Sequence, residues 1–302
     1  MADIRNRFQR DADRIVHSKS FRRLIHKTQM FLMPEGDHYR TRMTHALEVS
    51  RIARTMARAL SLDEDLTEAI ALGHDLGHPP FGHAGERALD AIIPGGFSHN
   101  RQSLRLVERL EKDGAGLNLS EEVCEGILRH TGDELSRTSE GRLVRHADRI
   151  AYLSHDMDDA VRGGLLHLTD VPAHLRRELG ESPRERINTL VNDLVASSRG
   201  GEVRFSPDRG EAMDELRTFM FDNVYFNPRA KGEEEKIPES VGLLFSYCLE
   251  RYDDVPEVLR RIAEEDGECK ERAVCDYIAG MTDRFFEAKL LEAFIPQGWK
   301  RV

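Results

Sequence analysis

The chain has 302 residues and a mass of 34.5 kDa, with 39% hydrophobic and 32% charged residues. A chain of this length and composition can bury a sizeable core, which excludes the disordered and fibrous classes. No run approaches the roughly 20 apolar residues of a membrane helix, and the charged start MADIRNRFQRDADRIV lacks the apolar segment of a secretory signal. Four sparse cysteines predict reduced thiols in a cytoplasmic protein, without a disulfide framework or a zinc cluster.

The net charge of −10 argues against a dedicated nucleic-acid-binding protein. Residues 1–60 have the opposite balance, with 13 Lys and Arg against 6 Asp and Glu. A basic segment on an acidic protein predicts a local anion site. A solvated basic face of an amphipathic helix would have the same charge, so composition leaves both interpretations open.

Helical periodicity predominates in the first half of the chain. Apolar residues recur every three or four positions in 44–60, which predicts an amphipathic helix. Ser61 and Glu64 form a capping-box pattern for a second helix that runs toward His74. The Pro-Pro pair at 79–80 ends any helix there. Further helices are expected at 84–93, 99–112, 121–130 and 145–162, the last closed by a Gly-Gly pair.

The second half carries fewer signals. The expected elements are loops at 197–201 and 227–236, a short strand at 201–206, and helices at 241–252 and 275–294. Alternating strand patterns are almost absent from the chain. We therefore predict an all-α fold in one compact domain.

Histidines and carboxylates gather in GHDLGHPPFGHAGE, residues 73–86. Imidazole and carboxylate groups together suit a divalent transition metal or a mixed nitrogen and oxygen site. Turn-capping residues are the simpler explanation of one His-Asp pair. Three histidines and two acids in one short segment favour a functional site; they are His74, Asp75, His78, His83 and Glu86.

A metal site in this segment needs ligands from elsewhere in the chain. His45 begins the helix at 44–60, where a single histidine is as readily an ordinary surface or core residue. The helix at 145–162 carries Asp148, Tyr152 and Asp156 four residues apart, so that they share one face. This polar stripe on an otherwise apolar helix predicts a metal or a polar ligand as its partner.

The order of His45, the His74-Asp75 pair and a later aspartate resembles the ligand order of the HD-domain phosphohydrolases. Longer strings resemble the deoxynucleoside triphosphate triphosphohydrolases, the dGTPase-like branch of that family. They are FRRLIHKTQ (21–29), GDHYRTRMTHALEVS (36–50), HDLGHPPFGHAGE (74–86), HNRQSLR (99–105), DRIAYLSHDMDDA (148–160) and DYIAGMTDRFF (276–286). The resemblance implies an HD-domain helical fold, with a catalytic core at 1–168 and a C-terminal helical portion of the same domain at 169–302.

The resemblance also implies one divalent metal ion, manganese first, with magnesium, iron, cobalt and nickel as alternatives. Its ligands would be His45, His74, Asp75 and Asp148. His155-Asp156 repeats the His-Asp pair, but the family's fourth ligand is the aspartate four residues before the tyrosine, which here is Asp148.

The remaining roles follow from the same strings. Catalysis would fall to His83 with Glu86, the histidine acting in proton transfer or as a nucleophile. The implied phosphate contacts are Arg42, His78, His99 and Arg149. The implied sugar contacts are Gln29, Tyr152 and Asp156.

The implied reaction splits a deoxynucleoside triphosphate (dNTP) into a deoxynucleoside and inorganic tripolyphosphate. One alternative is another HD phosphohydrolase, such as a 5′-deoxynucleotidase. Another is a dNTP-sensing or nucleic-acid-binding protein with secondary hydrolase activity. HD-GYP and alarmone hydrolases are disfavoured, since the chain has neither a GYP segment nor the acidic pair after the HD pair. The family implies a homo-oligomer, such as a hexamer. The preferred base, activation by a second dNTP and binding of single-stranded nucleic acid stay open.

Overall fold

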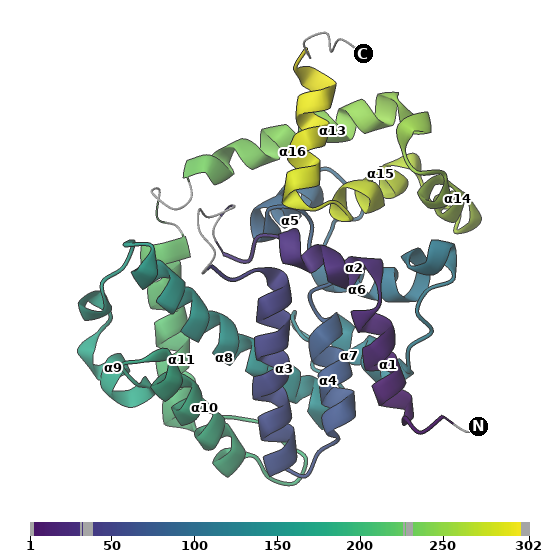
Figure 1. The fold of residues 1–302 in the computed structure, drawn as a ribbon. Helices are drawn as coiled ribbons and strands as arrows, with labels where there is room; N and C mark the ends of the chain where they lie inside the picture. Colours follow the sequence, from purple (N-terminus) through teal and green to yellow (C-terminus); the bar gives the residue numbers. More distant parts are fainter. Residues whose placement is uncertain (1–2, 31, 33–38, 226, 228–231, 297–302) are drawn as a thin grey trace.

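Helices form almost all regular structure in this computed structural model, which describes residues 3–30, 32, 39–225, 227 and 232–296 (Figure 1). The α-helices are α1 (Arg7–Val16), α2 (Lys19–Arg23), α3 (Arg42–Ala59), α4 (Glu64–Gly73), α5 (Gly82–Asp90), α6 (His99–Arg105), α7 (Glu121–Leu128), α8 (Ser139–Arg162), α9 (Ala173–Leu179), α10 (Pro183–Ser197), α11 (Pro207–Met220), α13 (Ile237–Glu250), α14 (Glu257–Glu265), α15 (Lys270–Ala279) and α16 (Asp283–Phe294). The predicted all-α class is confirmed.

The β pairings among the described residues are two isolated bridges, Thr28 with Thr41 and Arg199 with Glu202. The short strand expected at 201–206 is therefore wrong, because a single bridge does not extend into a ladder. Within the described ranges, no helix combines the length and the apolar character that a membrane crossing requires.

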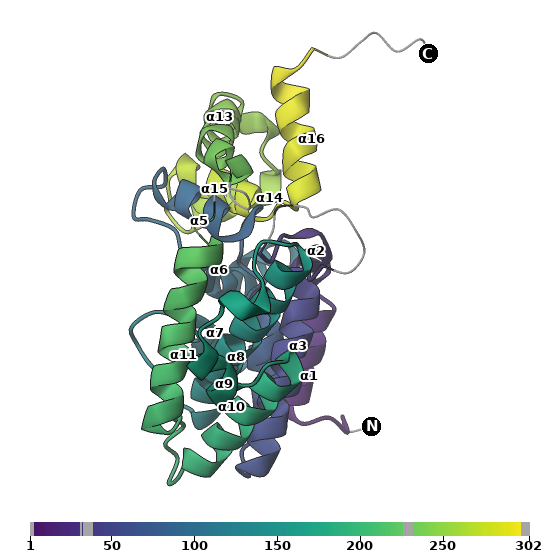
Figure 2. The same cartoon turned by 90° about the vertical axis from the view of Figure 1, so that its left-hand side faces the viewer.

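The lower part of the molecule is a helix bundle built around α3 (Figures 1 and 2). Helix α3 packs along α4 and α8, α1 packs on α4, and α10 covers α8. Their apolar faces share one cluster, the bundle core, which includes Ile15, Val49, Met56, Ile70 and Ile150. This packing holds the ends of α3, α4 and the middle of α8 at fixed distances.

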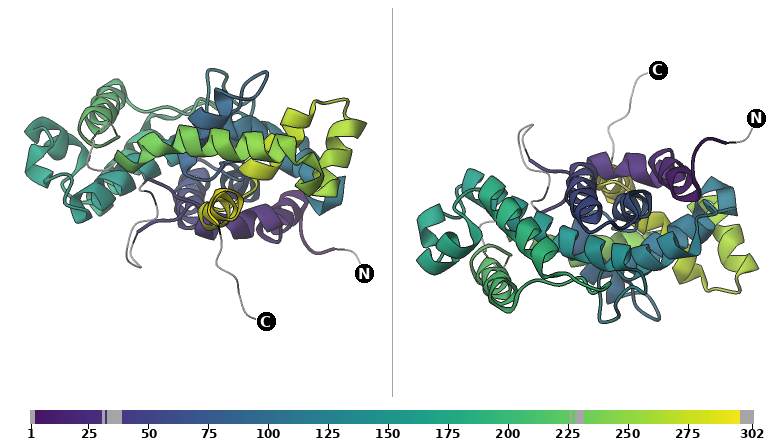
Figure 3. Two further views of the ribbon diagram at one scale, coloured as in Figure 1. Left: turned by 90° about the horizontal axis from the view of Figure 1, so that it is seen from above. Right: turned by 90° about the horizontal axis from the view of Figure 1, so that it is seen from below.

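A second layer lies on one end of the bundle. Helix α5 packs against α13, and α13 packs on α15 and α16. Helix α13 runs across the end of the bundle, and α16 stands roughly across α13 (Figure 3). These helices share a separate cluster, the upper cluster, in which the Phe81 and Phe286 ring centroids are 5.0 Å apart.

The division at residue 168 stays a prediction. Both clusters draw residues from both sides of it: the bundle core extends to Val224, and the upper cluster joins α5 to α13, α15 and α16.

Several element boundaries differ from the expectations. Helix α4 is capped by Asp63, whose side chain accepts from the backbone N–H groups of Asp65 and Leu66, and not by Ser61. The helix expected at 275–294 is two helices, since α15 ends at Ala279 and α16 begins at Asp283. Helices α9, α10, α11 and α14 carried no sequence prediction. Parts of the expected loop at 227–236 and of the string 36–50 lie outside the described residues.

Gly77 allows the turn after α4 to touch α6 directly. Its N–H donates to Ser103 Oγ at 2.8 Å, and that hydroxyl donates to the His74 carbonyl at 2.8 Å. A Cβ atom on Gly77 would collide with backbone atoms of His99, Gln102 and Ser103. The glycine therefore sets the spacing between His74 and His99, two predicted site residues.

We expect Gly77→Ala to destabilise the protein, because overpacking against a backbone costs about 1–3 kcal/mol. Gly242→Ala is the matched control, since Gly242 lies in α13 with no atom within 4 Å of the added Cβ. Alanine is the better helix former by about 1 kcal/mol, so the control should be neutral or more stable. Thermal unfolding followed by circular dichroism measures both variants. Equal midpoints for Gly77→Ala and the wild type would contradict the expected contact.

Candidate metal centre and active site

Three bundle helices bring imidazole and carboxylate groups to one point. His45 lies on α3, His74 follows the last turn of α4, and Asp148 lies on α8. Oδ1 of Asp148 is 2.9 Å from Nε2 of His45 and 3.8 Å from Nε2 of His74. One oxygen and two nitrogens therefore lie within reach of a single cation.

The environment of His74 favours a cation at this point. Nδ1 lies 2.6 Å from the Ala71 carbonyl oxygen, so Nδ1 carries the proton and Nε2 has a free lone pair. Nε2 is buried without a hydrogen-bond partner in the described part of the chain. Carboxylate oxygens of Asp75 and Asp148 lie 3.4 and 3.8 Å from it. A buried lone pair beside carboxylates is unfavourable by itself, and a cation between them would satisfy all three groups. The donor set fits a divalent metal ion.

His45 and Asp148 form a hydrogen-bonded pair. Burial opposes protonation of His45, but the Asp148 hydrogen bond and the nearby carboxylate charges together outweigh it and raise the pKa of His45. Burial also opposes ionisation of Asp148, but the His45 hydrogen bond together with the charges of His74 and His45 lowers its pKa overall.

Asp75 joins the metal group to the neighbouring residues. Its Oδ2 accepts from Nη1 of Arg42 at 2.8 Å, and its Oδ1 lies 3.2 Å from Nε2 of His78. Burial opposes ionisation of Asp75, but His74, His78 and Arg42 hold its pKa well below the usual value. Arg42 is 1% exposed, and its Nε and Nη2 have no acceptor among the described residues. These donors are available to an anionic ligand.

A second group forms where α5 and α6 begin. Glu86 accepts from two histidines: Oε2 is 3.0 Å from Nδ1 of His83, and Oε1 is 2.8 Å from Nδ1 of His99. Burial opposes ionisation of Glu86, but the two hydrogen bonds hold its pKa far below the usual value. The His83 side chain is 65% exposed, so its Nε2 can reach a ligand from solvent.

His78 connects the two groups. Its ring stacks on His99 with centroids 3.9 Å apart, and its Nε2 faces Asp75. Burial, reinforced by Arg42 and His99, holds the pKa of His78 well below the usual value. The metal group and the His83–Glu86 pair are therefore parts of one continuous site.

His130 belongs to this site and was missed in the sequence. It follows α7, with its ring 5.0 Å from that of His74 and its Nε2 3.2 Å from Nε2 of His99. Burial, with His74 and His99, lowers the pKa of His130 to about 3, so it is neutral at neutral pH. The sequence offered only one histidine at the end of a helix, and no local pattern distinguishes it from a core residue.

The face of α8 beyond Asp148 meets residues from the second half of the chain. The Tyr225 hydroxyl donates to Asp156 at 2.7 Å, and Asp156 is 7% exposed. Burial raises the pKa of Tyr152, which lies beside Arg217 of α11. Tyr225 was missed because its surroundings carry no sequence motif.

The other two residues predicted to contact the substrate are Arg149 and Gln29. Arg149 forms an ion pair with Asp214 of α11. Gln29 lies before α3, with its Oε1 buried and without a hydrogen bond among the described residues. Its backbone carbonyl lies beside Gly82. The structure thus brings Gln29 near the start of α5.

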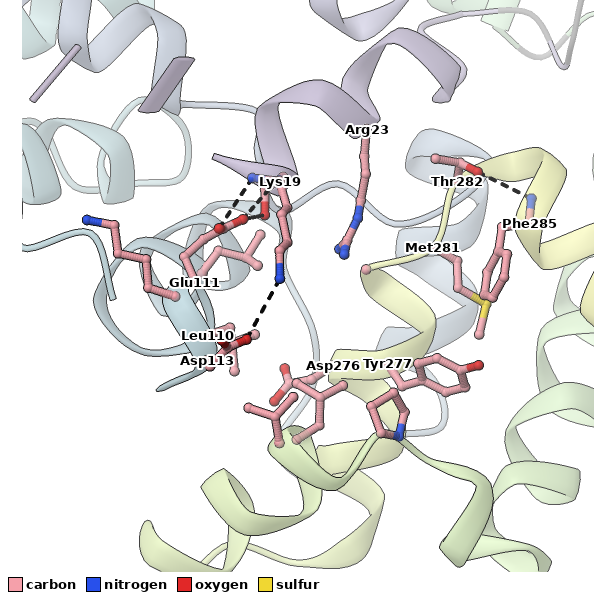
Figure 4. A pocket seen from close by; sticks show the side chains of 17 residues that line it. Lys19, Arg23, Leu110, Glu111, Asp113, Asp276, Tyr277, Met281, Thr282 and Phe285 are labelled. Atoms are coloured by element: carbon pink, nitrogen blue, oxygen red, sulfur yellow. Dashed lines mark hydrogen bonds and ion pairs between the residues drawn. The ribbon is translucent and has the colours of Figure 1, made fainter. Parts of the chain in front are cut away.

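A cavity of about 450 Å³ lies apart from the histidines, where α2 faces the junction of α15 and α16 (Figure 4). Arg23, Leu110 and Tyr277 are among its lining residues, and Lys19 pairs there with Asp113 at 3.7 Å. None of the predicted site residues lines it.

Comparison with known proteins identifies related chains. The HD domain family matches residues 42–153, and the phosphohydrolase-associated domain family matches residues 203–290. A deoxyguanosinetriphosphate triphosphohydrolase-like protein of Caldanaerobacter subterraneus subsp. tengcongensis is 54% identical, over 98% of this chain and 87% of the relative. Proteins with the same name from Clostridium perfringens and Desulfatibacillum aliphaticivorans are each 48% identical, over 98% and 97% of this chain and 89% of each relative.

The solved structure of a hypothetical protein from Aquifex aeolicus aligns with a TM-score of 0.47 and 20% identity, over 94% of this chain and 71% of that one. This likeness adds no argument. The sequence relatives match nearly the whole of this chain, and the HD domain match includes His45, His74 and Asp148. The chain therefore belongs to the deoxyguanosinetriphosphate triphosphohydrolase-like family of HD-domain phosphohydrolases.

Proposed function

We propose that the protein hydrolyses dNTPs to a deoxynucleoside and inorganic tripolyphosphate. The observation that carries this proposal is the continuous site, in which a metal-ligand set and the His83–Glu86 pair face each other across His78. The printed name of the relatives, deoxyguanosinetriphosphate triphosphohydrolase-like protein, supports a nucleoside triphosphate as the substrate.

In the proposed reaction, water attacks the α-phosphorus and the bond from that phosphorus to the 5′-oxygen breaks. The oxygen of water stays on tripolyphosphate, and the 5′-oxygen leaves with a proton as the sugar hydroxyl. A divalent ion held by His45, His74, Asp75 and Asp148 would polarise the phosphate and lower the pKa of water.

His83 is proposed to transfer the proton in this reaction. Glu86 accepts from its Nδ1, which leaves Nε2 as the working nitrogen. The exposure of His83 supports this role, because a proton donor must reach the substrate oxygen.

Arg42 is proposed to bind the triphosphate. A dNTP carries several negative charges, and charge-assisted hydrogen bonds to a guanidinium are among the strong ones. The acceptor-free Nε and Nη2 of Arg42 support this role. His78 lies beside Asp75 and His99 lies beside Glu86, and both would complete the phosphate contacts. Arg149 would join them only after leaving Asp214.

The sugar is proposed to lie against Tyr152 and Asp156. The Tyr225 hydroxyl donates to Asp156, which fixes the orientation of the carboxylate, and this carboxylate would accept from a 3′-hydroxyl. A ribose 2′-hydroxyl packed against Tyr152 would be left unpaired. Gln29 would close the pocket from the segment before α3.

The products test the proposed function. Each dNTP, NTP and deoxynucleoside monophosphate is incubated with the purified protein and manganese, and the phosphate products are separated by ion-exchange chromatography. We expect tripolyphosphate with dNTPs and turnover of GTP about tenfold to a hundredfold slower than of dGTP. The reason is that an unpaired buried polar group costs about 1–3 kcal/mol. Orthophosphate from deoxynucleoside monophosphates alone would favour a 5′-deoxynucleotidase, and equal turnover of GTP and dGTP would contradict the sugar pocket.

Two aspartates on α8 test the metal assignment. We expect Asp148→Ala to abolish metal retention, since Asp148 contributes the oxygen shared between His45 and His74. Asp156→Ala should retain the metal, because its partner is Tyr225. Elemental analysis after dialysis gives the metal content, and the rise in unfolding temperature on adding manganese gives a second readout. The reverse result, metal lost only in Asp156→Ala, would refute the assignment.

His83 and Arg42 should affect different kinetic constants. His83→Ala should lower kcat by about 10²–10⁴-fold with the metal content unchanged, as expected for a general acid or base. Arg42→Ala should raise KM as well, and it should also weaken metal retention because Asp75 loses its partner. His174→Ala is the control, since His174 is another exposed histidine paired with a glutamate, Glu215. Near wild-type kcat in His83→Ala would leave His83 as a turn residue.

A further inference from the structure

The string DYIAGMTDRFF, residues 276–286, has no part in the proposed chemistry. The chain turns there between α15 and α16, and Asp283 becomes the first residue of α16. Its carboxylate is 2% exposed, yet it lies in the upper layer, beyond the HD domain match. A buried charge needs partners, and the partners of Asp283 lie next to the proposed active site.

Asp283 binds two segments that are distant in the sequence. Oδ2 accepts from the backbone N–H of Thr28 at 2.9 Å and also from the Thr28 hydroxyl. Oδ1 accepts from the backbone N–H of Phe81 at 3.0 Å. One carboxylate therefore joins the segment before α3 to the start of α5.

Both segments carry residues with proposed roles. Thr28 directly precedes Gln29, and Phe81 lies two residues before His83. Phe81 has φ +64°, a left-handed conformation that is unfavourable for a residue other than glycine and persists only where its surroundings hold it. The bond from Phe81 N–H to Asp283 is one such constraint, and it sets the direction in which α5 presents His83.

Lys27 makes the complementary connection. Its Nζ donates to the carbonyl of His78 and, at 2.9 Å, to the carbonyl of Ala279. Lys27 is 3% exposed, and burial, with Arg23, lowers its pKa to about 7, against the opposing effect of Asp283. Lys27 and Asp283 thus connect the same three segments, 27–28, 78–81 and 279–283.

We propose that Asp283 and Lys27 are positioning residues, through which the C-terminal part of the chain sets the places of His83 and Gln29 relative to the metal group. This inference rests on the proposed function for the roles of those two residues. The packing of α5 on α13 in the upper cluster would still hold the layer together without the two charges. The polar contacts of Asp283 and Lys27 add a specific orientation of the segments that carry His83 and Gln29. Such an orientation matters more for the reaction rate than for the stability of the protein.

Asp283→Asn tests the proposal in the full-length protein with manganese. Asparagine keeps the size but turns one acceptor into an N–H₂ group that faces a backbone donor. We expect kcat for dGTP to fall about tenfold to a hundredfold, as expected for a small misplacement of a catalytic group. The preference for dGTP over GTP should fall with it, because Gln29 is displaced, while the metal content stays unchanged.

Asp193→Asn is the matched control. Asp193 accepts from the N–H and the hydroxyl of Ser206, at 2.9 and 2.7 Å, which repeats the contact of Asp283 with Thr28. We expect this variant to keep the kcat and the sugar preference of the wild type. If Asp283→Asn does not fold, Thr28→Val is the second variant, since it removes only the hydroxyl donor and keeps the shape.

Hydrogen–deuterium exchange separates this inference from the proposed function. Peptides covering 27–30 and 78–84 should exchange faster in Asp283→Asn than in the wild type. In Asp193→Asn their exchange rates should equal those of the wild type. This readout holds even if the wild type releases no tripolyphosphate, a result that refutes the proposed function alone. Wild-type exchange in those peptides overturns the positioning role, and so does an unchanged kcat with an unchanged preference for dGTP over GTP.

Discussion

Burial of the Asp75 carboxylate is the constraint on which the candidate site depends. A charge removed from water is unfavourable unless it is paired and hydrogen-bonded. Asp75 meets this condition with Arg42 from α3 and His78 from its own turn, while His74 Nε2 lies 3.4 Å away. Arg42 belongs to α3, whereas His74 and His78 belong to the same turn as Asp75. Satisfying one carboxylate therefore fixes the approach of α3 to the turn after α4.

The polar groups lie where two apolar clusters meet. The bundle core holds α3, α4 and α8 together, and the upper cluster holds α5 against α13, α15 and α16. Stability can thus come from leucine, isoleucine and phenylalanine packing on either side, while His74 Nε2 and His78 Nδ1 between the clusters have no hydrogen-bond partner among the described residues. Such groups are costly in a protein core and are typical of sites built to bind a ligand.

The HD domain match alone does not contain the whole site. Tyr225 and Asp283 lie in the stretch matched by the phosphohydrolase-associated domain, and both reach residues of the first half, Asp156 and Thr28. Asp276 does the same, accepting from Gln102 and Arg105 on α6. The C-terminal helices therefore supply carboxylate and hydroxyl groups that hydrogen-bond to residues of the first half, as well as apolar side chains that pack on α5.

The sequence by itself determined the all-α class, most helices of the first half and the family, because apolar periodicity, caps and contiguous strings are local properties of a chain. It also named residue types suited to a metal and to proton transfer. The tertiary structure decided which distant residues meet: His130 beside His74, Tyr225 on Asp156, and Asp283 on Thr28. It also decided two local features: Asp63 and not Ser61 caps α4, and the helix expected at 275–294 is interrupted before Asp283. The contacts between distant residues depend on how helices far apart in the chain pack together, and such packing leaves no pattern in neighbouring residues.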